Sequence, residues 1–284
     1  MLIDRLRPYL SDRELSRIVV EAGSRHRQIG ASIISPFCRA LERAAIDGKI
    51  PKSHEKIPRR ILQFWDQETI PPDVHDCMAT WRAIPDFEHV IFDDVRAREF
   101  INAECEPRHL EAYDLCNHPA MKSDLFRLAF LYRRGGMYID ADDIYEGRNI
   151  QRLFDGDGLF RLRSASFTRG ASEPPSTIYN NNPIFCVAND EILRKALERA
   201  TSIMLSLGKR EYYNMLVITG PLNLSIAVYA TALDCIAQGT DFRFHPIIGW
   251  DDISRKNPKM EYQKTTRNWR NAQAEAHNAK TEQK

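Results

Sequence analysis

The feature that most limits how this chain can fold is an apolar segment of helical length, residues 118–136, with the sequence HPAMKSDLFRLAFLYRRGG. Pro119 stands near its first turn and a glycine pair ends it, and both are typical boundary signals of a helix. MYID follows at once and has the pattern of a short buried strand. A buried helix that runs directly into a buried strand predicts an α/β fold.

The same alternation of strand and helix patterns continues along the chain after Ile61. Strands are predicted at ILQFW (61–65), FEHVIFDD (87–94), GLFRLR (158–163) and NPIFCVAND (182–190), and helices at 73–84, 190–205 and 220–233. Such alternation is typical of a mostly parallel sheet that is covered by helices on both faces.

The ends of the chain have a different character. Ser11 and Glu14 form a capping-box pattern that predicts one helix, and a second helix is expected over roughly 29–46. A Pro- and charge-rich linker, PKSHEKIPRR, follows. We therefore predict a helical N-terminal appendage over residues 1–55, an α/β domain over 56–254 and a basic polar tail over 255–284.

Composition describes an ordinary globular protein, with 43% hydrophobic and 28% charged residues among 284. There is no run of 18 apolar residues, so no membrane span is expected, and the charged N-terminus does not resemble a secretory signal. The six cysteines form no CxxC pair, which indicates reduced thiols rather than a zinc site. These features favour a cytoplasmic protein.

The net charge of +1 hides an uneven distribution. Residues 1–60 hold 13 Lys or Arg against 7 Asp or Glu, and residues 255–284 hold 8 against 3, whereas the stretch between them is acidic. No nucleic-acid partner is expected, because such proteins concentrate positive charge on the working domain. The basic ends could simply be solvated, or they could contact an anionic membrane surface at its inner face.

Three carboxylates stand within four residues at the end of the predicted strand MYID: Asp140, Asp142 and Asp143. Side chains alternate along an extended segment, so Asp140 and Asp142 face the same way. Two hard oxygen ligands suit Mn2+ or Mg2+ shared with water and a phosphate. An EF-hand is excluded, because Tyr145 and Gln151 stand where it needs Gly and Glu. A haloacid-dehalogenase-type phosphatase matches poorly, and an exposed acidic turn remains the plain alternative.

Asp124 and Arg127 lie three residues apart on one face of the apolar helix. Burying such a pair is expensive unless its geometry is good or a ligand takes up the remaining hydrogen bonds. The pair offers one hydroxyl acceptor and one planar fork of donors, which suits a sugar and a phosphate. A buried structural ion pair is the alternative.

The segment AMKSDLFRLAFLYRRGGMYIDAD resembles the core signature of the DXD-containing sugar transferases of glycosyltransferase family 32. This family includes initiating α-1,6-mannosyltransferases and bacterial capsular polysaccharide synthesis enzymes, and the glucosylating domains of large clostridial toxins are similar over the same segment. IPRRILQFWDQETIPPDV and TWRAIPDFEHVIFDD resemble the family's opening, so the resemblance covers roughly residues 57–145.

The resemblance implies a GT-A fold, in which a Rossmann-like domain binds a nucleotide sugar and a divalent metal, Mn2+ or Mg2+. It implies that Asp140 lies near the ribose and sugar and that Asp142 coordinates the metal, with Asp140 beside it. Asp124 and Arg127 would grip the donor sugar and its phosphate. The resemblance assigns three further binding residues: Trp65 to stack on the base, Tyr138 to support the pocket and Asn181 to border the donor or acceptor.

Other candidates are weaker. Asn180, Asn181 and Asn182 could instead form a turn, and Thr219 could simply belong to a helix cap. The resemblance would place His245 and Trp250 near the diphosphate of the donor. However, the clustered His residues and the Ser-Trp pair that usually end the family's sequences are missing here.

The resemblance thus implies transfer of a hexose from a UDP- or GDP-sugar to a glycan or lipid-linked acceptor, with retention, in surface polysaccharide or capsule synthesis. Two alternatives stay open. One is a toxin-like effector that glycosylates proteins, and the other is a catalytically inactive protein that binds nucleotide sugars.

Overall fold

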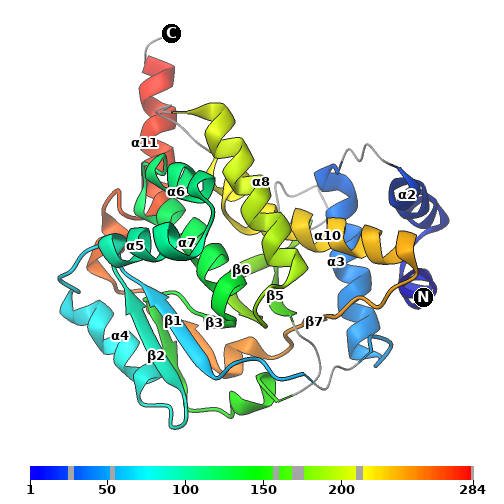
Figure 1. Ribbon diagram of the computed structural model, residues 1–284, viewed down its shortest axis with the longest axis horizontal. Coiled ribbons are helices and arrows are strands. Elements are labelled where there is room, and N and C mark those ends of the chain that lie inside the picture. Colours follow the sequence, from blue (N-terminus) through cyan, green and yellow to red (C-terminus); the bar gives the residue numbers. More distant parts are fainter. Residues whose placement is uncertain (25–28, 52–54, 156–159, 168–175, 209–213, 283–284) are drawn as a thin grey trace.

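The computed structural model describes residues 1–24, 29–51, 55–155, 160–167, 176–208 and 214–282 (Figure 1). Within them a six-stranded mixed sheet lies among helices, so the predicted α/β class is confirmed. The arrangement agrees with the GT-A type of fold that the resemblance implied.

The strands are β1 Arg60–Phe64, β2 Glu88–Phe92, β3 Gly136–Tyr138, β4 Asp143–Tyr145, β5 Phe160–Phe167, β6 Ser176–Cys186, β7 Phe244–Pro246 and β8 Ser254–Lys256. The α-helices are α1 Leu2–Leu6, α2 Asp12–Gly23, α3 Ala31–Ile46, α4 Pro72–Arg82, α5 Asp94–Glu104, α6 Pro107–Asp114, α7 Pro119–Arg134, α8 Glu191–Leu207, α9 Met215–Ile218, α10 Pro221–Gln238 and α11 Trp269–Glu282. Short 3-10 turns are η1 Arg7–Tyr9, η2 Gln151–Leu153, η3 Trp250–Asp252 and η4 Glu261–Lys264.

The strand order in the main sheet is β2-β1-β3-β6-β5-β7. Strand β1 pairs in parallel with both β2 and β3, and β5 pairs in parallel with β7. Strand β6 runs antiparallel to its neighbours β3 and β5. Because β1, β2 and β3 are parallel, their carboxyl ends lie together at one end of the sheet. Ligands of α/β proteins bind at the carboxyl ends of the strands.

Alternation along the central strands divides the core into two layers. Leu62 and Tyr138 face the large core formed with α7, α8 and α10, whereas Ile61 and Met137 face a second core that contains Trp81 of α4. This two-residue period is the one expected of strands that are buried on both faces.

The glycine pair between α7 and β3 is required by close backbone contacts. Gly135 and Gly136 have φ angles of +64° and +109°. A Cβ atom at Gly135 would lie 2.8 Å from the backbone nitrogen of Ala188, and one at Gly136 would lie 2.8 Å from the carbonyl oxygen of Arg60. The pair therefore lets the helix turn directly into the sheet, and its role is backbone packing.

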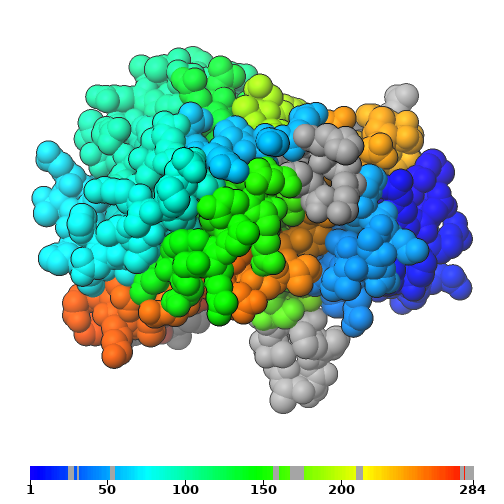
Figure 2. Space-filling model, turned by 90° about the horizontal axis from the view of Figure 1, so that it is seen from below, coloured from blue at the N-terminus to red at the C-terminus, as the bar shows by residue number. Residues whose placement is uncertain are grey.

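The N-terminal helices lie at the end of the molecule opposite α4, as Figures 1 and 2 show in blue. Helix α2 begins with the predicted capping box of Ser11 and Glu14. Helix α3 packs on the sheet, and the ring of Phe37 meets that of Tyr229 of α10 at 4.9 Å between centroids. The proposed boundaries of the appendage, the central domain and the tail stay predictions.

The stretch Met215–Gln238 is long and apolar enough to cross a membrane by length and composition. It comprises α9 and α10, and 67% of its apolar window is buried inside the fold. Helix α10 packs against α8 and β6, so this apolar stretch covers the sheet as a core helix.

The sequence predicts a basic polar tail over residues 255–284, and the structure gives part of this segment a defined place. Strand β8 pairs antiparallel with β4 to form a separate two-stranded sheet. Turn η4 follows β8, and α11 extends from the body of the molecule (Figure 1).

Candidate functional site

The acidic residues lie in the turn that leaves β3 and enters β4. Asp142 and Asp143 are buried, whereas the side chain of Asp140 is 25% exposed. Asn182 of β6 holds this turn: its Oδ1 accepts a hydrogen bond from the Asp140 backbone at 3.0 Å, and its Nδ2 donates to Asp143 Oδ2 at 2.7 Å. The carboxylates are therefore fixed at the sheet edge where β3 ends.

The Asp124–Arg127 pair of α7 lies directly beside this turn. The Arg127 guanidinium is 3.1 Å from the Asp124 carboxylate and 3.4 Å from that of Asp140. Asn181 donates to Asp124 at 2.7 Å, and its carbonyl accepts from Arg127 at 2.8 Å. Thr219 also donates to Asp124, at 3.1 Å. The helix and the strand thus meet in one buried polar network.

Tyr138 links the helix to the acidic turn. Its hydroxyl donates to Asp140 Oδ1 at 3.0 Å and lies 2.8 Å from Ser123 Oγ. The Arg127 guanidinium lies over the Tyr138 ring, 3.9 Å from its centroid. The structure therefore brings together five predicted site residues: Asp124, Arg127, Tyr138, Asp140 and Asn181.

Asp142 is held by the C-terminal segment. The Tyr262 hydroxyl and the Gln263 side chain both donate to Asp142 Oδ2, at 3.0 and 2.9 Å. The Lys256 ammonium is 3.5 Å from Asp140 Oδ2 and 4.0 Å from Asp142 Oδ1. The basic tail therefore contributes one cation and two hydrogen-bond donors to the acidic residues.

One guanidinium is shared between two carboxylates, and the pKa values of the neighbouring acidic groups are shifted in different directions. Burial raises the pKa of Asp124 to about 6, although Arg127 opposes the shift. Burial acts in the same direction on Asp140, but Arg127 and Lys256 outweigh it and lower that pKa. Burial and Asp140 raise the pKa of Asp143 to about 7. Desolvation of the ammonium by its neighbours would lower the pKa of Lys256, but Asp140, Asp142 and Asp143 raise it overall.

The donor set fits a divalent cation. The described contacts of the network set four carboxyl groups (Asp124, Asp140, Asp142 and Asp143) against two cations, Arg127 and Lys256. Within the described residues Asp143 Oδ1 is buried and has no hydrogen-bond partner. Buried carboxylates in excess of their counter-charges and hard oxygen donors are what Mg2+ and Mn2+ require. Asp140 and Asp142 would hold such an ion.

Trp65 lies immediately after β1 and packs against Ala141 of the acidic turn. The Arg267 guanidinium covers its ring at 4.9 Å from the centroid, and Tyr262 meets its edge at 5.3 Å. Within the described residues its indole Nε1 is buried without a partner. Stacking of a base on Trp65 stays a prediction, and on the covered face it requires Arg267 to move.

Two weaker candidates lie elsewhere. His245 is on β7, three strands away from β3, and its Nε2 lies 3.0 Å from the carbonyl oxygen of Pro51. Trp250 is a core residue, stacked on Trp81 at 6.3 Å between centroids. The structure does not bring either side chain to the acidic residues. The alternative that residues 180–182 form a turn is wrong, because all three lie within β6.

Several side chains of the site went unrecognised as site residues in the sequence. Ser123 stands in the quoted motif, so its signal was present but unused. Gln63 of β1 is fully buried, and its amide donates to the carbonyl oxygen of Asp140 at 3.2 Å. A polar residue inside the apolar run ILQFW was a usable signal. Lys256, Tyr262 and Gln263 lie in a polar tail that offered none.

A pH effect follows from His89 of β2, whose Nε2 lies 2.7 Å from Gln63 Oε1. Burial and then Arg82 lower the pKa of His89 from 6.5 to about 4. The contribution of His89 to stability is therefore complete above pH 6.5 and is lost as the pH decreases toward 4, by at most about 1.4 kcal/mol per pH unit. We expect the wild type to lose unfolding free energy relative to His89→Gln as the pH falls, in urea unfolding at pH 7, 6, 5 and 4.5. A difference between the two proteins that does not change with pH would contradict the assignment.

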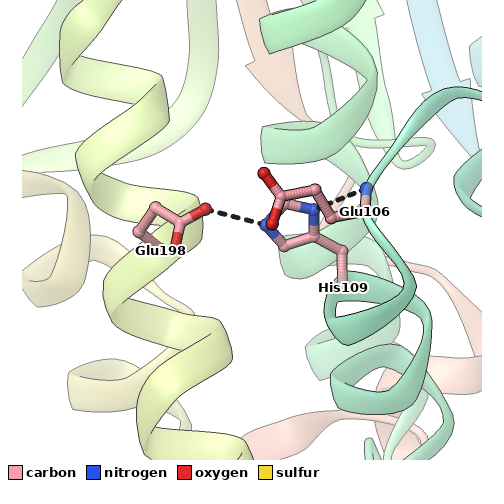
Figure 3. Close-up of side chains that lie close together, drawn as sticks. All are labelled: Glu106, His109 and Glu198. Atoms are coloured by element: carbon pink, nitrogen blue, oxygen red, sulfur yellow. Dashed lines mark hydrogen bonds and ion pairs between the residues drawn. The ribbon is translucent and has the colours of Figure 1, made fainter.

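A second group of metal-ligand residues joins α6 and α8 (Figure 3). His109 Nδ1 accepts a hydrogen bond from the Glu106 backbone at 3.3 Å, and its Nε2 lies 3.0 Å from Glu198. Arg108 also pairs with Glu198, at 2.9 Å. Both imidazole nitrogens of His109 therefore have a partner, and the contacts of His109 with Glu198 link α6 to α8.

Comparisons with known proteins agree with the family resemblance of the sequence. Residues 71–155 match the model of the "glycosyltransferase sugar-binding region containing DXD motif", and this range contains Asp140 and Asp142. Inositol phosphoceramide mannosyltransferase 3 of Schizosaccharomyces pombe is 33% identical over 171 residues, which are 60% of this chain and 44% of the relative. An uncharacterized glycosyltransferase, L373, of Acanthamoeba polyphaga mimivirus is 36% identical over 89 residues, or 30% of this chain and 36% of the relative.

The chain thus spans less than half the length of these curated relatives. Among solved structures, the PaToxG glycosyltransferase aligns with a TM-score of 0.48 and 18% identity, over 79% of this chain and 89% of the other. The sequence match over residues 71–155 supports the resemblance noted for residues 57–145: this part of the chain is similar to a glycosyltransferase sugar-binding region that contains a DXD motif.

Proposed function

We propose that this protein is a metal-dependent glycosyltransferase that moves a hexose from a UDP- or GDP-sugar to a glycan or lipid-linked acceptor. The observation that carries the proposal is the network at the end of β3, where Asp124, Arg127 and Tyr138 converge on Asp140 beside buried Asp142. The match of this segment to a sugar-binding region supports the same reading.

Each residue of the network has a separate role in this proposal. Asp124 accepts hydrogen bonds from hydroxyl groups of the donor sugar, and Arg127 donates hydrogen bonds from its N–H groups to the departing phosphate. A nucleoside diphosphate leaves readily only when its growing negative charge is neutralised, and preorganised charges do this with little rearrangement. A divalent cation held by Asp140 and Asp142, Mn2+ or Mg2+, would supply Lewis-acid stabilisation of that diphosphate. Tyr138 and Asn181 hold Asp140 and Asp124 in place.

The choice of donor and acceptor is guided by the relatives. Those from yeast are named as mannosyltransferases of inositol phosphoceramide. We therefore place GDP-mannose first among donors and inositol-phosphate lipids first among lipid acceptors, ahead of capsular glycans and proteins. Retention of the anomeric configuration is part of the proposal, and the coupling constant of the product's anomeric proton measures it.

The basic N-terminal segment also offers a surface for a membrane. Val19 and Val20 of α2 are 51% and 71% exposed, beside a segment with an excess of Lys and Arg. Exposed apolar groups flanked by basic ones favour anionic lipid surfaces. We propose peripheral contact of a cytoplasmic protein with the inner membrane face, which co-sedimentation with anionic vesicles tests.

The test of the main proposal is release of nucleoside diphosphate from a panel that contains GDP-mannose, UDP-glucose and UDP-galactose, with Mn2+ or with EDTA. We expect one donor to be hydrolysed only with metal. The same donor should raise the melting temperature, because a ligand that binds only the folded state stabilises it. Binding without release would favour the inactive alternative, and a panel that neither shifts melting nor releases product would overturn the proposal.

A further inference from the structure

Lys256 is fixed beside the acidic turn by its backbone. In the ladder between β4 and β8, Lys256 is the partner of Asp143. The next residue, Asn257, donates its backbone N–H to the carbonyl oxygen of Asp142 at 3.0 Å. The two connections place the base of the Lys256 side chain next to the predicted metal ligands, whatever the conformation of its long aliphatic chain.

The ammonium faces the two carboxylate oxygens that the rest of the network leaves open. Asp140 Oδ1 accepts from Tyr138, and Asp142 Oδ2 accepts from Tyr262 and Gln263. The other two oxygens, Asp140 Oδ2 and Asp142 Oδ1, lie 3.5 and 4.0 Å from Lys256 Nζ. Among the described side chains Lys256 is the group that bridges this oxygen pair.

The bridge is loose. Charge-assisted hydrogen bonds between an ammonium and a carboxylate are usually about 2.7–2.9 Å long, so both contacts are longer than a direct bond. The Lys256 side chain is 59% exposed, and a flexible chain of this kind can turn outward at little cost. The ammonium therefore balances the charge of the pair without closing its coordination sites.

We propose that Lys256 is an intrachain stand-in for the divalent cation: its ammonium holds the Asp140–Asp142 pair in the metal-free protein and gives up that position when the metal binds. This inference rests on the proposed function, because it takes this pair as the metal ligands. Two cations cannot share one pair of oxygens at close range, so metal binding must move the ammonium or work against its charge.

A measurable linkage follows. The metal-free protein is stabilised by Lys256, and its affinity for metal is reduced by the same competition, because only molecules with the ammonium displaced are competent to bind. Lys256→Met keeps the aliphatic stem and removes the charge. We expect the variant to bind Mn2+ at least about fivefold more tightly than the wild type and to melt at a lower temperature in EDTA.

The experiment uses the full chain and Mn2+ without any donor. Isothermal titration gives the Mn2+ affinity, and thermal unfolding in EDTA and in Mn2+ gives the stabilisation by metal. Lys264→Met is the matched control, because Lys264 lies in the same segment, is 68% exposed and pairs with Glu261. We expect this control to follow the wild type in both measurements, whereas the Lys256 variant should gain more from Mn2+.

The outcomes separate the inference from the proposed function. Equal Mn2+ affinity in the wild type and Lys256→Met, with donor turnover present in the wild type, overturns the stand-in role and leaves the enzyme proposal intact. Unchanged Mn2+ affinity together with weaker binding of GDP or UDP would make Lys256 a diphosphate anchor and would likewise overturn it. Absence of Mn2+ binding in both proteins, with no donor turnover, overturns the two together.

Discussion

Replacement of Asp142 by asparagine is expected to reduce donor turnover by at least about 1000-fold, or about 4 kcal/mol of transition-state stabilisation. The carboxylate is buried and lies at the predicted metal position, so the substitution removes a negative charge that a cation needs. The fold should persist, because the asparagine carbonyl can still accept the hydrogen bonds of Tyr262 and Gln263. Nucleoside diphosphate release measures the activity, and thermal unfolding measures the fold.

The control for this experiment is Asp251→Asn. The Asp251 side chain is 93% exposed and pairs with Arg163, and this carboxylate has no part in the network at β3. We expect wild-type turnover in the control. A wild-type rate in Asp142→Asn itself would show that the cation is not held there.

Replacement of Arg127 by methionine is expected to cost about 3–5 kcal/mol of unfolding free energy, because it leaves Asp124 and Asp140 without their shared counter-charge. The guanidinium also donates to Asn181 and Ser123 and lies over the ring of Tyr138. Urea unfolding at pH 7 measures the loss. Donor turnover should disappear with it, since the same group serves the departing phosphate.

A matched substitution, Arg98→Met, separates burial from charge. Arg98 forms two hydrogen bonds with Asp114, at 2.9 and 2.8 Å, but its side chain is 54% exposed. Exposed ion pairs are screened by solvent, so this variant should unfold close to the wild type. If both methionine variants lost the same stability, the buried network would not be the reason for the effect.

The part of the site that the sequence predicts is the part built from neighbours in the chain. Asp124 and Arg127 share a helix face because they are three residues apart, and Tyr138 and Asp140 share a strand face because they are two apart. The glycine pair ends the helix directly at the strand. Local geometry accounts for each of these two pairs, and the family resemblance implied that the four side chains serve one site.

The contribution of the tail depends on contacts between distant parts of the chain. Lys256 lies 116 positions after Asp140, and Tyr262 lies 120 positions after Asp142. These residues stand in a polar segment with no hydrophobic period, so its pattern indicates solvent exposure. The pairing of β8 with β4 is one of the contacts that bring this segment to the site.

A similar reason explains the missed elements of the fold. The segment that forms α5 and α6 is rich in charged residues, so it was not predicted as helical. Asn180–Asn182 resembled a turn by composition. They lie inside β6 because Asn181 and Asn182 hydrogen-bond with Asp124, Asp140 and Asp143, which offsets the cost of placing amides in a buried strand.

The order of strands in the sheet shows that the region matched by the family model is not the same as a unit that could fold by itself. Residues 71–155 carry the recognisable region and include β2 and β3, but β1, which lies between these two strands, comes before residue 71. Strand β6, the other neighbour of β3, comes after residue 155. An excised 71–155 fragment would leave the backbone of β3 unpaired on both sides, so the matched region is not an autonomous folding unit.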